Sequence, residues 1–334
     1  MKNITISDVA KHAGVSKSTV SQYLNGRYEY MSEHTRKKVE YSIRELNYRP
    51  NIIARSLSQK STFTVGIIVA NILHSFSTHI IRAIELNFNK HGFHTIVCNA
   101  DDEPEKERQY IEMLMAKQVD GMIIFPTGDN LDLYEQMKKK KYPIVFMDRT
   151  IEGLGIPSIL LENEQAAEMA VKALTDNGHS RIAMLTAPVT RNITPRLERI
   201  EGYKKALVSR GIQVKDEYIH SVEVEEMKVS LRNMFKLDQR PAAIIAGSDR
   251  VLVEILNFAR EHQLVIPKDL AVIGIDDVSF ANLFTPQLTT ISQPTAKMAN
   301  KAVELLLQQI KGDQKLSDYK TIRFGGQLNM RQSH

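Results

Sequence analysis

Short polar and basic side chains gather between Ser16 and Asn25, and their types suit contact with nucleic-acid bases. Lysine, serine and glutamine side chains hydrogen-bond to base edges, and glutamine can make two such bonds to adenine. The residues expected to face outward are Lys17, Ser18, Ser21 and Gln22. They can read bases only if one face of a helix presents them together.

Two short helices are predicted around these residues, one on each side of Gly14. Thr5 and Asp8 stand three residues apart, as in the capping box that starts a helix. Gly14 favours the positive φ of a helix end, and Ser16 is placed to cap the second helix. The spacing of a helix-turn-helix motif is met by Ala10, Gly14 and Val20.

The excess positive charge of the chain lies in its first 60 residues. The 334 residues include 44 Lys and Arg against 39 Asp and Glu, a formal net charge of +5. Residues 1–60 hold 11 basic and 5 acidic residues, so they carry +6 and the rest carries −1. A compact basic segment is typical of phosphate binding. A third helix is predicted from about residue 33, with Ser32 as its cap. A helical bundle without DNA binding is the alternative.

Two stretches of this region match a known pattern. They are Thr5-Ile6-Ser7-Asp8-Val9-Ala10-Lys11-His12-Ala13-Gly14-Val15-Ser16-Lys17-Ser18-Thr19-Val20-Ser21 and Leu46-Asn47-Tyr48-Arg49-Pro50-Asn51-Ile52-Ile53-Ala54-Arg55-Ser56-Leu57. The first resembles the headpiece of the LacI/GalR family of bacterial transcription regulators, and the second resembles that family's hinge. The similarity continues to about residue 330.

This resemblance implies a set of DNA-contacting residues. They are Thr5, Ser16, Lys17, Ser18, Thr19, Ser21, Gln22, Asn25, Tyr48, Asn51, Ala54, Arg55 and Leu57. It implies that Leu57, on a hinge helix in the minor groove, is the wedge that kinks the DNA, with a core role as the alternative. Most relatives carry arginine where Gln22 stands. Because glutamine favours adenine and arginine favours guanine, we expect adenine at that operator position.

Strand-like and helix-like segments alternate after residue 62. Strands are predicted near residues 63–70, 94–99, 121–126, 143–147, 181–186, 218–222, 242–246 and 271–275. Helices are predicted near residues 75–90, 104–118, 130–140, 163–177, 195–210, 225–236 and 249–262. This rhythm predicts an α/β fold with two lobes, each a doubly wound parallel sheet. The resemblance implies a body like that of a periplasmic binding protein.

The predicted organisation has three parts. They are a helix-turn-helix headpiece at residues 1–50, a hinge helix and linker at 51–60, and an effector-binding and dimerisation domain at 61–334. The resemblance implies that the chain crosses between the lobes three times. One lobe then comprises residues 61–161 and 292–324, and the other comprises residues 162–291 and 325–334.

Polar residues stand where predicted strands end, which is where ligands of doubly wound sheets bind. Asp148, Ser248 and Asp276 each follow such a strand, although aspartate and serine are also ordinary turn residues. Matched to the family's effector pocket, the candidates are Asp148, Arg199, Ser248, Asp276 and Gln293. Asn71 and Phe76, which follow the first strand, are expected to line the other wall, and Arg196 is added because it lies near a strand end. Phe76 is expected to stack on the ligand or close over it, with core packing as the alternative.

Arginines are frequent near the same strand ends. They are Arg149, Arg191, Arg196 and Arg199. Because a guanidinium group suits a carboxylate or phosphate, we expect an anionic effector such as a sugar acid or a sugar phosphate. Exposed arginines paired with Glu198 and Glu201 are the alternative. Val20-Ser21-Gln22-Tyr23-Leu24-Asn25 and Glu29-Tyr30-Met31 are also similar to segments of repressors of 2-keto-3-deoxygluconate utilisation.

Other classes of protein fit the sequence less well. It has no Walker-type phosphate loop, no Gly-x-Ser-x-Gly elbow and no His-Glu-x-x-His, so we expect no enzyme. His91 and His94 lack further ligands, and neither a metal nor a cofactor is expected. With one cysteine, Cys98, no apolar leader of about 7–15 residues and no apolar run near about 18, we expect a cytoplasmic protein that does not contact membranes.

The sequence therefore predicts a repressor of a catabolic operon that a small effector controls. It would bind the half-sites of a pseudo-palindromic double-stranded operator as a homodimer, since no leucine heptad tail follows Met330. A periplasmic-type sugar-binding module without a transcriptional role shares the two-lobed body and is the main alternative. A sugar-phosphate enzyme is the third.

Overall fold

Two units make up the chain, Met1–Thr62 and Phe63–His334. The computed structural model describes residues 4–48, 61–313 and 321–334 of them. The predicted hinge residues lie outside the described residues; they are Asn51, Ala54, Arg55 and Leu57.

The first unit contains the three predicted helices. They are α1 (Ile6–Ala13), α2 (Lys17–Leu24) and α3 (Glu33–Glu45), with a 3₁₀ turn, η1 (Tyr28–Tyr30), before α3. The predicted capping box is confirmed, because the Thr5 amide donates to Asp8 Oδ2 at 2.8 Å and the Thr5 side chain accepts from the Asp8 amide. Gly14 has the expected left-handed φ, 66°. Ser16 and Ser32 cap α2 and α3 as predicted.

A small apolar core holds the three helices together. Its buried members are Val9, Ala10, Ala13, Val20 and Val39. Ser42 is also buried; its hydroxyl donates to the Lys38 carbonyl and lies 2.9 Å from His12 Nδ1. Because α2 packs through Val20, its opposite face keeps Lys17 and Ser18 exposed.

The second unit begins with a lobe built on a six-stranded sheet, here called the first lobe. The strand order is β11-β5-β4-β3-β1-β2, and every neighbouring pair is parallel. The strands are β1 (Thr64–Val69), β2 (His94–Asn99), β3 (Gly121–Ile124), β4 (Ile144–Met147), β5 (Ser158–Leu161) and β11 (Thr321–Phe324).

Helices cover both faces of this sheet. On one face lie α5 (Ser75–Lys90) and α12 (Thr295–Lys311), and on the other lie α6 (Pro104–Ala116) and α7 (Leu131–Lys139). The apolar residues of α5 recur every four positions at Phe76, Ile80, Ile84 and Phe88, so one stripe of this helix is buried against the strands.

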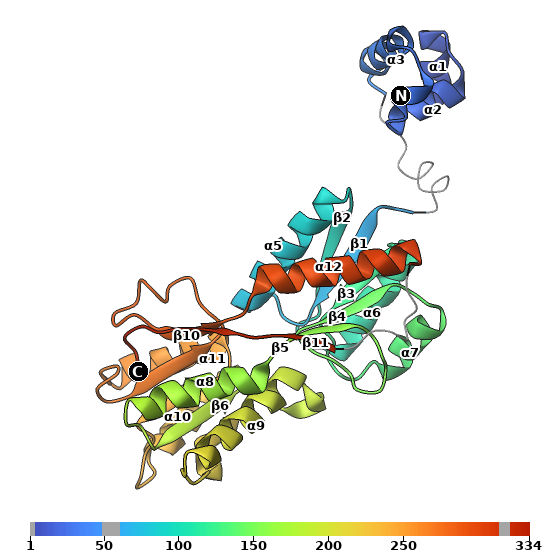
Figure 1. Cartoon of the computed structure of the whole chain (residues 1–334). Helices are drawn as coiled ribbons and strands as arrows, with labels where there is room; N and C mark the ends of the chain where they lie inside the picture. The colour runs from blue at the N-terminus through green and yellow to red at the C-terminus, as the bar shows by residue number, and fades with distance from the viewer. Residues whose placement is uncertain (1–3, 49–60, 314–320) are drawn as a thin grey trace. The chain divides into compact units, whose positions relative to one another are not determined.

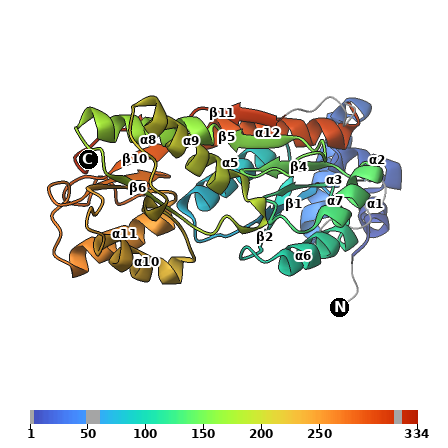
Figure 2. The same cartoon turned by 90° about the horizontal axis from the view of Figure 1, so that it is seen from below.

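The second lobe repeats the plan with the order β12-β10-β9-β8-β6-β7. Its strands are β6 (Ile182–Thr186), β7 (Ile219–Ser221), β8 (Ala243–Ala246), β9 (Ala271–Ile275), β10 (Thr289–Ser292) and β12 (Gln327–Asn329). Helices α8 (Asn163–Asp176) and α9 (Thr194–Ser209) lie on one face, and α10 (Met227–Phe235) and α11 (Asp249–Glu261) lie on the other (Figure 2). The predicted α/β fold is confirmed, except that β12 runs antiparallel to β10.

Three segments connect the lobes (Figure 1). They follow β5, β10 and β11, at residues 161–163, 292–295 and 324–327. The strands preceding residues 148, 248 and 276 end toward the junction of the lobes, so residues of both lobes can line one site there.

Candidate functional site

Helix α2 presents the first candidate surface, that of a nucleic-acid interface. Ser16, Lys17 and Ser18 are exposed at its start, and Ser21 and Gln22 are partly exposed one turn later. Ser16 caps the Thr19 amide at 3.1 Å and lies 2.6 Å from the Ser18 hydroxyl, so these hydroxyls form one chain. The helix therefore offers donors and acceptors along one side.

Other predicted DNA-contacting residues have structural roles in the first unit. Thr5 caps α1. Asn25 ends α2, and the Asn25 side chain donates to Ser21 Oγ at 3.4 Å. Tyr48 is partly buried against the core of the unit. Arg36 stacks on the Tyr28 ring with its guanidinium carbon 4.1 Å from the ring centre, which fixes the 3₁₀ turn beside α3.

The second candidate site is a cavity between the two lobes. All eight residues predicted for effector binding line it: Asn71, Phe76, Asp148, Arg196, Arg199, Ser248, Asp276 and Gln293. The rest of the lining is Ala70, His74, Ser77, Phe125, Arg149, Thr186, Ala187, Pro195 and Gly247. The first lobe supplies Asp148 and the second lobe supplies Asp276, so carboxylates from both lobes meet at one place.

Asp148 and Asp276 share the same backbone conformation at the end of a strand. Asp148 follows β4 with a φ of 66°, and Asp276 follows β9 with a φ of 80°. Aspartate enters the left-handed region more readily than most residues, and there each strand can end in an abrupt turn. Burial raises the pKa of both carboxyl groups, against the lowering effect of Arg199 and other cations.

Arg199 is the most firmly held cation of the cavity. Its guanidinium is buried, and it donates to the Gly247 carbonyl at 2.6 Å and to Asn163 Oδ1 at 3.0 Å. Its Nη1 lies 3.9 Å from Asp276 Oδ2, and Gln293 donates to the other oxygen of Asp276 at 2.6 Å. The alternative of exposed arginines does not describe Arg199.

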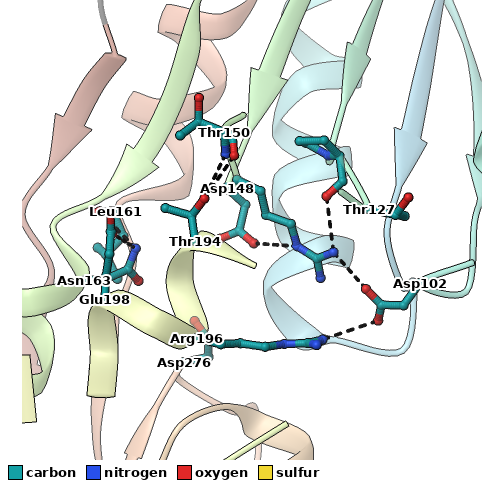
Figure 3. A network of polar contacts seen from close by, with 12 residues as sticks. Asp102, Thr127, Asp148, Thr150, Leu161, Asn163, Thr194, Arg196, Glu198 and Asp276 are labelled. Carbon is teal, nitrogen blue, oxygen red and sulfur yellow. Dashed lines mark hydrogen bonds and ion pairs between the residues drawn. The ribbon is translucent and has the colours of Figure 1, made fainter. Parts of the chain in front are cut away.

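Glu198 supports Arg199 from behind the cavity. The Asn163 side chain that accepts from Arg199 donates to Glu198 Oε2 at 2.9 Å. Arg323, on β11 of the first lobe, donates to both oxygens of Glu198, at 2.9 and 2.5 Å. A line of polar contacts thus runs from the cavity to a strand of the other lobe; Figure 3 labels Asn163 and Glu198 within it.

Arg149 and Arg196 form a second cationic group. Arg149 Nη1 lies 2.8 Å from one oxygen of Asp102, and Arg196 Nη2 lies 3.6 Å from the other. Burial, and then repulsion by Arg149, lowers the pKa of Arg196 to about 10. Arg191 lies outside the cavity lining and pairs with Asp129 at 3.1 Å. Three of the four predicted arginines therefore converge on the cavity.

Phe76 packs in the core of the first lobe and also lines the cavity. It is only 7% exposed. Its ring meets the ring of Phe125 edge to face, with centres 6.3 Å apart. Packing therefore fixes its position at the wall of the cavity.

Sequence reasoning missed two contacts that join the lobes at this site. Asp249, the first residue of α11, accepts from the Ser75 amide at 2.5 Å and lies 2.6 Å from His74 Nδ1. Asp102 contacts arginines from both lobes, as described above. No spacing in the sequence indicates the first contact, because His74 and Asp249 are 175 positions apart.

Two buried polar atoms of the cavity lining have no hydrogen-bond partner among the described residues. They are Gln293 Oε1, an acceptor, and Arg149 Nε, a donor whose only contact is an ion pair with Asp148 Oδ2 at 3.9 Å. Buried polar atoms are normally paired, so these two are places where a small polar molecule would gain hydrogen bonds.

No group of three or more His, Cys, Asp or Glu side chains could hold a metal ion in residues 4–48, 61–313 and 321–334. Across the same ranges, no helix is long and apolar enough to cross a membrane.

Two family models match parts of this chain. Residues 5–51 match the family described as bacterial regulatory proteins, lacI family, and residues 171–334 match a periplasmic binding protein-like domain. The probable HTH-type transcriptional regulator EndR of Paenibacillus polymyxa is 45% identical over 334 residues, covering 98% of each chain. The HTH-type transcriptional regulator KdgR of Bacillus subtilis is 33% identical over 332 residues, covering 98% of this chain and 97% of that protein.

A solved structure extends the agreement to the whole fold. The lac repressor dimer bound to operator and the anti-inducer ONPF superposes with a TM-score of 0.86 at 26% identity, covering 99% of both chains. The similarity to KdgR fits the predicted likeness to repressors of 2-keto-3-deoxygluconate utilisation. From its helix-turn-helix to its two-lobed body, this chain belongs to the lacI family of bacterial regulatory proteins and is a transcriptional regulator.

Proposed function

We propose that this protein is a homodimeric repressor of a sugar-acid catabolic operon, and that a small anionic effector in the cavity between the lobes controls its affinity for operator DNA. One observation carries the proposal. A helix with an exposed polar face belongs to the same chain as a cavity lined by buried arginines and aspartates from two lobes.

The DNA side of the proposal rests on α2 and on charge. Lys17 and Ser18 are exposed, and Gln22 is partly exposed on the same helix. In this reading α2 lies in the major groove, Gln22 pairs with an adenine, and the basic residues of the +6 segment contact phosphates. Two copies of the chain would bind the two halves of a pseudo-palindrome.

The chemistry of the cavity supports a sugar acid as the effector. Aspartates such as Asp148 and Asp276 accept hydrogen bonds from the hydroxyl groups of a sugar, and guanidinium groups suit a carboxylate. Arg149 Nε, which has only a 3.9 Å ion-pair contact with Asp148, and Gln293 Oε1, which accepts no hydrogen bond from the described residues, would gain hydrogen bonds from such a molecule. The similarity to KdgR makes 2-keto-3-deoxygluconate the first compound to test.

Control of DNA binding follows from contacts that cross between the lobes. The pairs His74–Asp249 and Arg196–Asp102 each join one lobe to the other, and the cavity lies between them. An effector that contacts both lobes binds their closed and open arrangements with different affinities, and it shifts the equilibrium by that difference.

A direct experiment selects binding sites for the full chain from a random DNA library. The expected result is an inverted repeat whose affinity falls steeply as salt rises, because binding displaces counterions from phosphates. Failure to enrich any sequence would contradict the proposal and favour a sugar-binding module. Titration of the selected complex with 2-keto-3-deoxygluconate, gluconate, galacturonate and glucose then tests the effector; a response to glucose alone would contradict the anionic assignment.

A further inference from the structure

The carboxylate of Asp102 lies where the anionic group of a ligand would be expected. Arg149 Nη1 is 2.8 Å from its Oδ1, and Arg196 Nη2 is 3.6 Å from its Oδ2. Arg149 belongs to the first lobe and Arg196 to the second, so two guanidinium groups from opposite lobes share one carboxylate. Figure 3 shows the Asp102 carboxylate facing the guanidinium group of Arg196.

The same two arginines also line the cavity, whereas Asp102 does not. Arg149 and Arg196 thus contact the Asp102 carboxylate and also border the cavity. Arg149 Nε makes no hydrogen bond among the described residues and has only a 3.9 Å ion-pair contact with Asp148 Oδ2, while Nη1 lies 2.8 Å from Asp102 Oδ1 and donates to the Pro126 carbonyl at 3.4 Å. The arginine pair can therefore still donate hydrogen bonds to a ligand in the cavity.

Electrostatics favour an anion between these two arginines. Burial and the nearby charge of Arg149 lower the pKa of Arg196, so the two cations destabilise each other. Burial tends to raise the pKa of Asp102, but Arg149 and Arg196 together hold it below its usual value. At neutral pH Asp102 is an anion that balances part of the charge of the pair.

The backbone of the loop before α6 holds Asp102 in place. Its amide donates to the Ala70 carbonyl at 2.6 Å, and its carbonyl accepts from Arg191 Nη1 at 2.7 Å. Its φ is 57°, in the left-handed region, where asparagine and glycine are also tolerated. Two arginines of the second lobe, Arg191 and Arg196, thus contact this one residue of the first lobe.

We propose that Asp102 is an internal competitor for the anionic group of the effector, and so a residue that sets which ligand charge the cavity accepts. The ligand class is a small molecule with a carboxylate or phosphate group. When that group binds Arg149 and Arg196, it replaces Asp102 as their counter-ion and releases one contact between the lobes. This inference rests on the proposed function, because it assumes that ligand binds in this cavity.

The test compares anion binding by the wild-type full chain and by the variants Asp102→Asn, Asp102→Gly and Asp129→Asn. Asn keeps the shape of the side chain, Gly suits the left-handed backbone, and Asp129→Asn removes an ion pair that also joins the lobes but lies outside the cavity. Melting temperature is measured against inorganic phosphate, and against gluconate and glucose, at constant ionic strength.

Phosphate and gluconate should raise the melting temperature of both Asp102 variants. The anion concentration that gives half of the maximal rise should be at least about tenfold lower than for the wild type. Glucose should show no such difference, and Asp129→Asn should match the wild type. Equal midpoints in wild type and Asp102 variants, or an equal gain in Asp129→Asn, would overturn the inference. Because these titrations contain no DNA and use phosphate, their outcome is separate from operator binding and from the identity of the natural effector.

Discussion

Glu198 and Arg323 form a bidentate ion pair that joins helix α9 of the second lobe to strand β11 of the first. The nitrogens of Arg323 lie 2.9 and 2.5 Å from the two carboxylate oxygens, across 125 positions of sequence. Through Asn163, the same carboxylate is connected to Arg199 in the cavity. The pair therefore links the orientation of Arg199 to a strand of the first lobe.

A double-mutant cycle on Glu198→Gln and Arg323→Met should measure a coupling free energy of about 1 kcal/mol, because the contact is bidentate and the side chains of Arg323 and Glu198 are only partly exposed, at 31% and 20%. Denaturant unfolding of the four proteins gives the value. The matched control is Glu201 with Lys204, a single 3.7 Å contact between more exposed groups on the same helix. That pair should couple by less than about 0.5 kcal/mol. Equal coupling in the two cycles would contradict the assigned role.

Replacing Gln22 by arginine should change operator preference at one position. Gln22 is expected to pair with adenine, whereas arginine makes two hydrogen bonds to guanine. Binding-site selection with Gln22→Arg should therefore enrich guanine at the position where the wild type enriches adenine, and each protein should prefer its own site by about 1–3 kcal/mol. An unchanged consensus would mean that Gln22 does not contact a base.

Glu107 should prove essential to the stability of the first lobe. This fully buried carboxylate accepts from the Thr127 amide at 2.8 Å, from Asn130 at 2.7 Å and from the Tyr134 hydroxyl at 2.5 Å. Glu107→Gln would turn an amide toward these donors, so the free energy of unfolding should fall by about 2–3 kcal/mol. Glu105→Gln, an exposed change on the same helix, is the control and should cost less than about 0.5 kcal/mol.

The pair His74–Asp249 should make stability depend on pH in the acid range. Burial tends to raise the pKa of Asp249, but the hydrogen bond and charge of His74 lower it more, and the folded-state pKa is depressed. An aspartate of the unfolded chain titrates near pH 3.9, about where the stabilising effect begins to decline on acidification. The folded state then binds fewer protons than the unfolded state, so this stabilisation is present above that pH and is lost as the pH falls through the depressed pKa.

Asp249→Asn should accordingly lower the free energy of unfolding at pH 6, and the difference from wild type should shrink as the pH falls below about 4. Urea unfolding at a series of pH values measures this difference. A difference that stays constant from pH 6 to pH 3 would show that the carboxylate charge is not what stabilises this contact.

Local signals in the sequence account for most of the fold. Capping residues such as Thr5, Ser16 and Ser32 mark helix starts, and alternating apolar runs mark the strands, so β2, β9 and α5 have the predicted bounds. Strands β5, β10, β11 and β12 and helix α12 escaped prediction. Length is not the reason, because β3, β4 and β8 are equally short and α12 runs from Thr295 to Lys311.

The cavity lining was predictable where residues stand at strand ends or match the family pattern, as Asp148 and Arg199 do. Its ion pairs were not. The partners of Asp102, Glu198 and Asp249 come from distant positions that only the folded sheets bring together, and no spacing rule connects them. The net charge of the chain also does not predict that Arg149, Arg196 and Arg199 each lie beside a carboxylate.

The central claim is that ligand in the cavity controls DNA binding, and one measurement addresses it most directly. The affinity of the full chain for its selected operator is measured by fluorescence anisotropy with and without saturating 2-keto-3-deoxygluconate, for wild type and for Arg199→Met. We expect the ligand to change the wild-type affinity by at least about tenfold, a coupling of about 1.4 kcal/mol, and the variant's by less than about twofold. No change in the wild type, or an equal change in Arg199→Met, would contradict the account.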